Sequence, residues 1–148
     1  NIQSVSEHII LKLEVSKQIF EKASEIVHNS YMTNAFEKLA LVRADFQKEL
    51  ARHSGINIQN LDLDFKDRLR IEATKIAMQF DSLLLTRNEK EILGFVKDQA
   101  ASLIIVYQDA IKTVKEETAL IVILERQQAT IKQNYQTIVR EYEGYVYV

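Results

Sequence analysis

Four polar residues stand in the middle of the apolar faces of the expected long helices. They are Ser16, Arg43, Gln99 and Gln128. Antiparallel packing of these helices would bring the four into one layer near the centre, where helix bundles build ligand and metal sites. A hydroxyl, a guanidinium and two amides could bind a small anionic ligand there. The alternative is that Arg43 and the glutamines extend to the edge of the stripe and bury only their apolar stems.

A second set of residues has the side-chain types that bind iron or manganese. Di-metal bundles use Glu from two helices and a Glu-x-x-His motif from each of two others. The sequence has one such motif, Glu25-Ile-Val-His28, where we expect an ordinary pair at a helix end and no cofactor. A metal site is therefore the alternative interpretation. Its residues would be Glu14, Glu21, Glu25, His28 and Asp45.

The other catalytic patterns in the sequence are incomplete. Asp62-x-Asp64 begins like a calcium-binding loop, but Asp67 stands where that loop needs Gly. Ser54 beside His53 has no placed Asp and no oxyanion hole. The three glycines lie far apart and there is no Cys, which excludes phosphate-binding glycine loops and thiolate chemistry. We expect a protein that is not an enzyme.

The composition is that of one ordinary domain spanning residues 1–148. Nineteen basic and 21 acidic residues give a formal net charge of −2, and the signs alternate, so nucleic acid is not an expected partner. The longest apolar run, residues 119–124, is far shorter than the ~20 residues of a membrane span. Since Cys and a secretory signal are both absent, the expected location is the cytoplasm.

Zero Pro and only three Gly favour long helices with few turns. Apolar residues recur at steps of three and four, which predicts amphipathic helices. The first helix is predicted to begin at a capping box, Ser4-Val-Ser-Glu7, and to end at His28-Asn29-Ser30. The second begins near Met32 and ends near His53-Ser54-Gly55, where Gly can adopt the left-handed cap conformation.

Residues 55–64 form the one extended polar connection and are predicted to be a crossover. Asp64 is expected to cap a third helix over residues 65–85. The fold predicted is all-α, an antiparallel bundle of four long helices with a shorter helix inside the crossover. Alternatively, residues 65–85 lengthen an open array of five helices.

The last half of the chain needs one more break. Asn88 and Glu91 form a capping box for a fourth helix. A helix unbroken from there to Glu143 would be ~80 Å long, so we place the break between Thr113 and Thr118, at the capping signal Thr113-Val-Lys-Glu116. The fifth helix is predicted to end at Gly144.

Tyrosines gather at the end of the chain, at Tyr142, Tyr145 and Tyr147. An exposed aromatic tail could dock on a second subunit, which makes a homodimer or another protein partner possible. The alternative is that the tail folds back over its own bundle.

Three stretches carry a resemblance to a known family: Phe20-Glu-Lys-Ala23, residues 36–50, and Tyr107-Gln-Asp-Ala-Ile111. They match an aromatic-x-x-Ala end of the first helix, a Leu-Ala-x-x-Arg-x-x-aromatic-x-x-x-Leu run in the second, and a Tyr-x-x-Ala-Leu-like run in a later helix. On this order, from about Val5 to Tyr142, the chain resembles an uncharacterised bacterial family of ferritin-like four-helix proteins, some of them linked to stress.

The resemblance implies a ferritin-like bundle but no particular activity, because the family is uncharacterised. Where metal-binding relatives place a ligand Glu before the Arg of the second helix and a ligand after it, this chain has Val42 and Asp45. Gln128 and Ile131 stand at the matching positions of the last helix. A buried Arg43 would repel divalent cations, so the resemblance implies a bundle that has lost its di-metal site.

The expected function is a non-enzymatic, ferritin-like bundle that acts through its surface as an interaction or stress-associated protein. Two alternatives stay open. One is a metal-binding oxidoreductase or storage protein, and the other is a carrier of a small anionic ligand at the central polar layer.

Overall fold

The computed structural model describes residues 2–86 and 88–146, with side chains up to residue 144. Within these residues it contains five α-helices, one turn of 3-10 helix and no strands, which confirms the all-α prediction. The elements are α1 (Ile2–Ile26), α2 (Ser30–Ser54), η1 (Ile58–Asn60), α3 (Leu63–Thr86), α4 (Glu89–Thr113) and α5 (Thr118–Val146).

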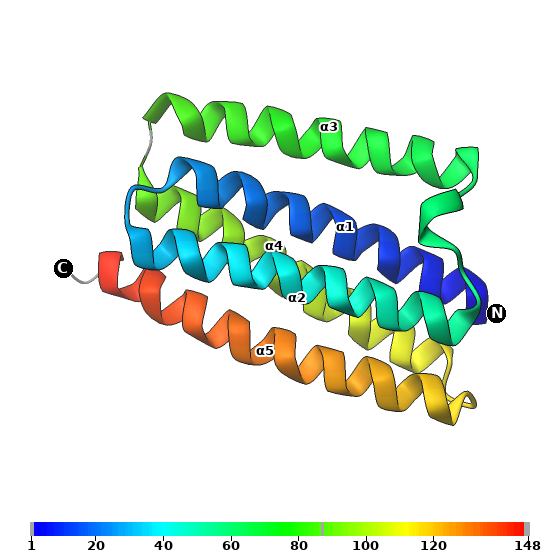
Figure 1. The fold of residues 1–148 in the computed structure, drawn as a ribbon. Helices are drawn as coiled ribbons and strands as arrows, with labels where there is room; N and C mark the ends of the chain where they lie inside the picture. The colour runs from blue at the N-terminus through cyan, green and yellow to red at the C-terminus, as the bar shows by residue number, and fades with distance from the viewer. Residues whose placement is uncertain (1, 87, 147–148) are drawn as a thin grey trace.

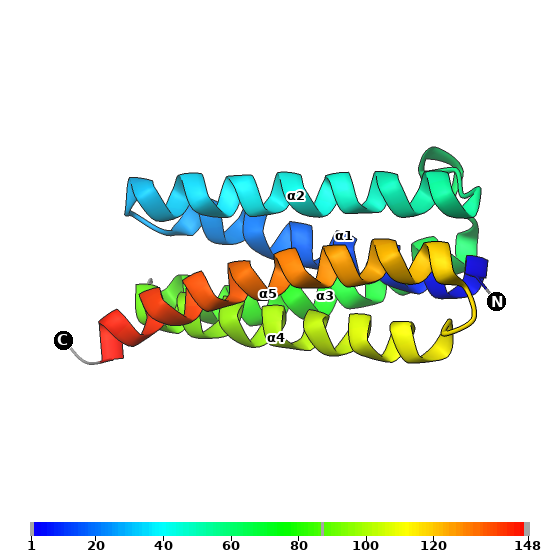
Figure 2. The same ribbon diagram turned by 90° about the horizontal axis from the view of Figure 1, so that it is seen from below.

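Successive helices run in opposite directions along one long axis (Figure 1). Because α3 runs back along the bundle after α2, the helices α2 and α4 point the same way. α1 packs most extensively against α2 and also contacts α4 and α3, while α5 packs mainly on α4. The start of α5 lies near the end of α2, and the two helices diverge toward the end of α5 (Figure 2).

The crossover helix differs little in length from most of the other helices. α3 has 24 residues, against 25 for α1, α2 and α4 and 29 for α5, so it is shorter, as predicted, but only by one residue than three of the others. Its buried residues Phe65, Ile76 and Phe80 span most of its length, and burying them along α1 requires a helix that runs the length of the bundle. α3 therefore lies as a fifth helix outside the four formed by α1, α2, α4 and α5.

Two polar side chains set the start of α2 and α3. Asn29 accepts hydrogen bonds from the amides of Tyr31 (2.9 Å) and Met32 (3.3 Å), so this residue, predicted to close α1, begins α2 instead. Asp62 accepts from the amide of Phe65 at 2.8 Å. The cap of α3 is therefore Asp62 and not Asp64, because a carboxylate two residues earlier satisfies the free amide.

Three further helix ends test the predicted capping signals. α1 extends to Ile2, so Ser4 lies inside the helix and is not its cap. Asn88 accepts from the amides of Lys90 and Glu91 and so caps α4 as predicted, while the carboxylate of Glu91 accepts from Thr86 Oγ1. The break between Thr113 and Thr118 is confirmed. Thr113, however, donates its hydroxyl to the carbonyl of Asp109 at 2.9 Å within α4, so no capping box makes the break.

The end of α5 also differs from the prediction, because the helix continues past Gly144 to Val146. The ring of Tyr142 lies under Lys97 Nζ, 4.1 Å from the ring centroid, and closely covers Gly94. This tyrosine therefore folds back on its own bundle. The side chain of Tyr145 and all of Tyr147 lie outside the described residues. The docking of this tail on a second subunit therefore stays a prediction.

The core consists of two hydrophobic clusters at the two halves of the bundle. On α1, Leu13 belongs to one cluster and Ile19 to the other, with Ser16 between them. On α2, Ala40 and Phe46 lie in different clusters, on either side of Arg43. The polar residues thus mark the level at which the core changes from one cluster to the other.

Gly55, the residue that ends α2, is in the left-handed conformation with φ 68°. We expect Gly55→Ala to lower the free energy of unfolding by about 1 kcal/mol, because a Cβ is strained at this φ although it meets no atom within 4 Å. Chemical denaturation measures the change.

Gly144→Ala is the matched control, since this glycine is helical and a Cβ there also meets nothing within 4 Å. It should raise the free energy of unfolding by up to about 1 kcal/mol. A Gly55→Ala variant at least as stable as the wild type would contradict the left-handed cap.

Candidate functional site

Arg43 is a cation enclosed in the bundle, with no exposed surface. Its Nε donates to Ser16 Oγ over 3.4 Å, and its guanidinium lies over the ring of Phe20, 4.9 Å from the centroid. Nη1 and Nη2 are buried and have no hydrogen-bond partner in the described part of the chain. Burial lowers the pKa of Arg43 to about 10, so the group is still protonated at neutral pH.

Glu49, a half-buried carboxylate of α2, is engaged elsewhere. Tyr107 donates its hydroxyl to Gln127 Oε1 at 2.7 Å, and Gln127 Nε2 donates to Glu49 Oε1 at 2.8 Å. Glu49 also accepts a hydrogen bond from Arg126, which lowers the pKa of Glu49. Burial raises the pKa of Tyr107, so it stays a neutral donor. Glu49 is therefore paired with Arg126 and Gln127 and does not act as a counter-ion to Arg43.

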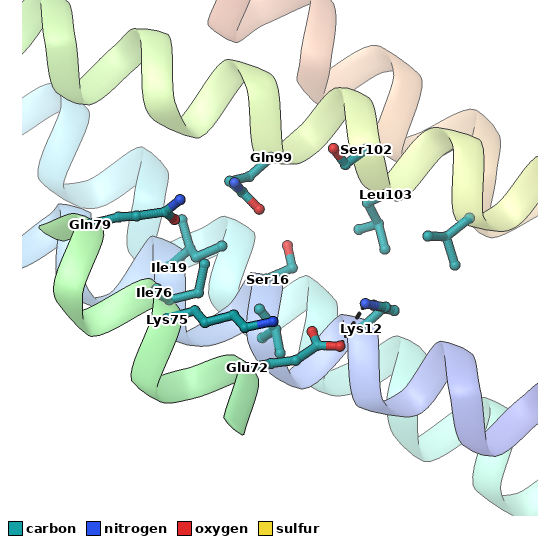
Figure 3. Close-up of a pocket in the computed structure, with 12 residues that line it drawn as sticks. Lys12, Ser16, Ile19, Glu72, Lys75, Ile76, Gln79, Gln99, Ser102 and Leu103 are labelled. Atoms are coloured by element: carbon teal, nitrogen blue, oxygen red, sulfur yellow. Dashed lines mark hydrogen bonds and ion pairs between the residues drawn. The ribbon is translucent and has the colours of Figure 1, made fainter. Parts of the chain in front are cut away.

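A pocket with a volume of about 370 Å³ opens between α1, α3 and α4, next to Ser16 (Figure 3). Its floor consists of buried side chains: Val15, Ser16, Ile19, Ile76 and Leu103. Its more exposed rim consists of Lys12, Glu72, Lys75, Gln79, Gln99, Ser102 and Val106. The floor is thus apolar except for one hydroxyl, and nearly all of the polar groups lie around the opening.

The charges of the rim do not balance. Lys12 Nζ lies 2.7 Å from Glu72 Oε1, an ion pair that joins α1 to α3. Lys75, on the same helix as Glu72, forms no ion pair with any residue that the structure describes, and Figure 3 shows it extending along the pocket toward Ser16. One lysine of the rim is therefore free to bind an anion.

Ser16 connects the pocket to the buried guanidinium. Because its Oγ accepts the Nε–H of Arg43, the Ser16 hydroxyl proton is free to point elsewhere, and Figure 3 shows this oxygen directed toward the pocket. A donor that is itself polarised by a cation makes a stronger hydrogen bond to an anion than an isolated hydroxyl does. The deepest polar group of the pocket is therefore suited to a negatively charged acceptor.

The structure joins three of the four predicted polar residues around this site. Ser16 contacts Arg43, and Gln99 faces Ser16 across the pocket (Figure 3). Gln128 lies apart, since its Nε2 donates to the Ile104 carbonyl at 3.2 Å and to Gln108. The alternative in which Arg43 reaches the edge of the stripe is wrong, because its side chain is completely enclosed.

Sequence reasoning missed the contribution of α3, namely Glu72, Lys75 and Gln79. Their spacing carries a signal, since the three flank Ile76, which is buried against the bundle. A predicted outer helix of unknown rotation, however, does not show which polar residues border its buried stripe.

The residues of the metal alternative are not gathered. Glu14 lies 3.2 Å from Lys17, and Glu21 lies 3.9 Å from the same lysine. Glu25, His28 and Asp45 are exposed. Among the residues that the structure describes, no group of three or more His, Asp or Glu side chains is placed to hold a metal ion. None of the described helices is both long and apolar enough to cross a membrane.

Comparison of the chain with protein-family models, with curated proteins and with solved structures finds no match. The function must therefore be inferred from the geometry of the pocket and of the buried guanidinium behind it.

Replacing Arg43 by an apolar side chain of similar length tests whether its charge is uncompensated. We expect Arg43→Met to raise the free energy of unfolding by about 1–3 kcal/mol, because the variant no longer buries a charge without a counter-ion. Chemical denaturation in the absence of added anions measures the change.

Arg140→Met, at an exposed position on α5, is the control and should change stability little. If Arg43→Met instead lost several kcal/mol, the guanidinium would have a stabilising partner inside the bundle, and the description of Arg43 as unpaired would be incorrect.

Proposed function

We propose that this protein is a non-catalytic helical bundle that binds a small anionic ligand in the pocket between α1, α3 and α4. The observation that carries the proposal is the enclosed Arg43, with two nitrogens that lack partners, directly behind the one hydroxyl of the pocket floor. Of the functions open to this sequence, anion binding is the one that uses this charge.

The electrostatic argument follows from burial. A charge removed from water costs several kcal/mol unless an opposite charge or a full set of hydrogen bonds compensates it. An anion that accepts the Ser16 hydroxyl would lie one hydrogen bond beyond the Nε of Arg43, and the bond between Arg43 and Ser16 is itself buried. Its attraction to the guanidinium is screened much less there than at the surface.

The remaining donors of the pocket suit the same ligand. Lys75 supplies an unpaired ammonium group, and the amide of Gln99 faces the space from α4, where Ser102 also lines the opening (Figure 3). Donors from three helices thus converge on one anion. A volume of about 370 Å³ is at the lower end of the range for ligand pockets, which indicates a small molecule.

We also propose that the four core helices are a ferritin-like bundle that has lost its di-metal site. In support, α1–α2 and α4–α5 are antiparallel pairs joined by a connection that runs the length of the bundle. A guanidinium at the bundle centre opposes divalent cations. A surface interaction, a role in stress, a homodimer and a cytoplasmic location remain proposals from the sequence, and the pocket geometry favours none of them.

Isothermal titration calorimetry with hexanoate and with inorganic phosphate tests anion binding. We expect at least one of the two to bind with one site per chain. Lys75→Gln should weaken that binding by about tenfold or more, because it removes a charge-assisted hydrogen bond. Arg43→Met should weaken it as well, since the attraction behind Ser16 is lost.

Lys48→Gln is the matched control, because Lys48 is exposed on α2 and lines neither this pocket nor the apolar pocket between α2 and α5. Its affinity should equal that of the wild type. If neither anion bound with a dissociation constant below about 1 mM, or if both lysine variants lost the same affinity, the proposed function would be refuted.

A further inference from the structure

We infer that the ligand is an apolar monocarboxylate, a short hydrocarbon acid, and that Glu72 excludes more highly charged anions; this rests on the proposed anion binding. The floor and rim of the pocket differ in chemistry, and the ligand must match both. Three features of the pocket support the inference: the apolar side chains of its floor, its position along the helices, and the net charge of its rim.

The apolar floor of the pocket favours a ligand with a hydrocarbon part. Apart from Ser16, its side chains are Val15, Ile19, Ile76 and Leu103, each at most 8% exposed. A ligand that lies on them gains free energy in proportion to the apolar surface it buries. A small hydrated anion such as phosphate would leave these side chains uncovered and would have to give up water in order to approach them.

The position of the pocket disfavours phosphate for a second reason. Protein phosphate sites rely on free backbone amides at helix starts and in glycine-rich loops. Ser16, Ile76 and Leu103 lie well inside α1, α3 and α4, where backbone amides are already bonded within the helix. Only side chains can donate here, and they suffice for the two oxygens of a carboxylate.

The rim carries one uncompensated positive charge. Lys12 is paired with Glu72, which leaves Lys75 as the free cation of the opening. One carboxylate neutralises Lys75 while it accepts from Ser16. A dianion would bring a second negative charge to the rim beside Glu72, where like charges repel, because Arg43 does not line the pocket and cannot pair with it directly. Glu72 is therefore the residue that selects for a single charge.

The test compares hexanoate, 1-hexanol and inorganic phosphate by calorimetry on the wild type and on Glu72→Gln. For the wild type we expect hexanoate to bind at least tenfold more tightly than either of the others. In Glu72→Gln the affinity for phosphate should rise by about tenfold while that for hexanoate changes less than threefold. The variant removes the charge of Glu72 and releases Lys12 from its ion pair, and a dianion gains more from both changes than a monocarboxylate does.

Glu21→Gln is the control, since Glu21 lies on α1 outside the pocket and is 53% exposed. It should change neither affinity. Phosphate binding as tightly as hexanoate, or a phosphate affinity unchanged by Glu72→Gln, would overturn the inference and leave anion binding intact. Failure of both anions to bind, or 1-hexanol binding as tightly as hexanoate, would instead refute the proposed function itself.

Discussion

The burial of Arg43 is the constraint on which the rest of this structure depends. A guanidinium has five N–H donors, and the described part of the chain offers it one acceptor, Ser16 Oγ at 3.4 Å from Nε, and the face of the Phe20 ring. Cation–π attraction and one hydrogen bond do not replace the hydration that an enclosed charge gives up. The folded chain therefore holds at its centre a positive charge without a counter-ion among the described residues, and this is the basis of the proposed anion binding.

The layout of the bundle places this charge where a ligand can reach its neighbourhood. The core divides into two hydrophobic clusters at the level of Ser16 and Arg43, so the polar pair interrupts the close packing there. α3, which buries only three residues, covers this level from outside and adds Glu72 and Lys75 to the opening. α3 thus covers the level where the two core clusters meet, and its charged residues form part of the rim of the pocket there.

Much of the fold follows from local signals in the sequence, and the site follows only in part. The caps at Asn88 and Gly55 are predictable because one or two residues satisfy the geometry of a helix end. Gln127 and Gln128 cannot be separated in this way, since either continues the stripe from Leu124 to Ile131. Both are buried, and what distinguishes them is a contact between helices: Gln127 accepts the hydroxyl of Tyr107, whereas Gln128 donates to the carbonyl of Ile104.

The ¹⁵N NMR signal of the Arg43 Nε–H group, assigned by its absence in Arg43→Met, tests the central claim most directly. The Nε–H proton of a buried guanidinium exchanges slowly enough with water for its signal to be observed. The ¹⁵N chemical shift of Nε depends on its hydrogen bond to Ser16, and this bond changes when the Ser16 hydroxyl donates to a ligand. We expect titration with hexanoate to move this signal in a saturable way, at the same concentration that gives half-maximal binding by calorimetry. A signal that stays fixed while hexanoate binds would show that Arg43 is not coupled to the pocket, and would contradict the role assigned to its charge.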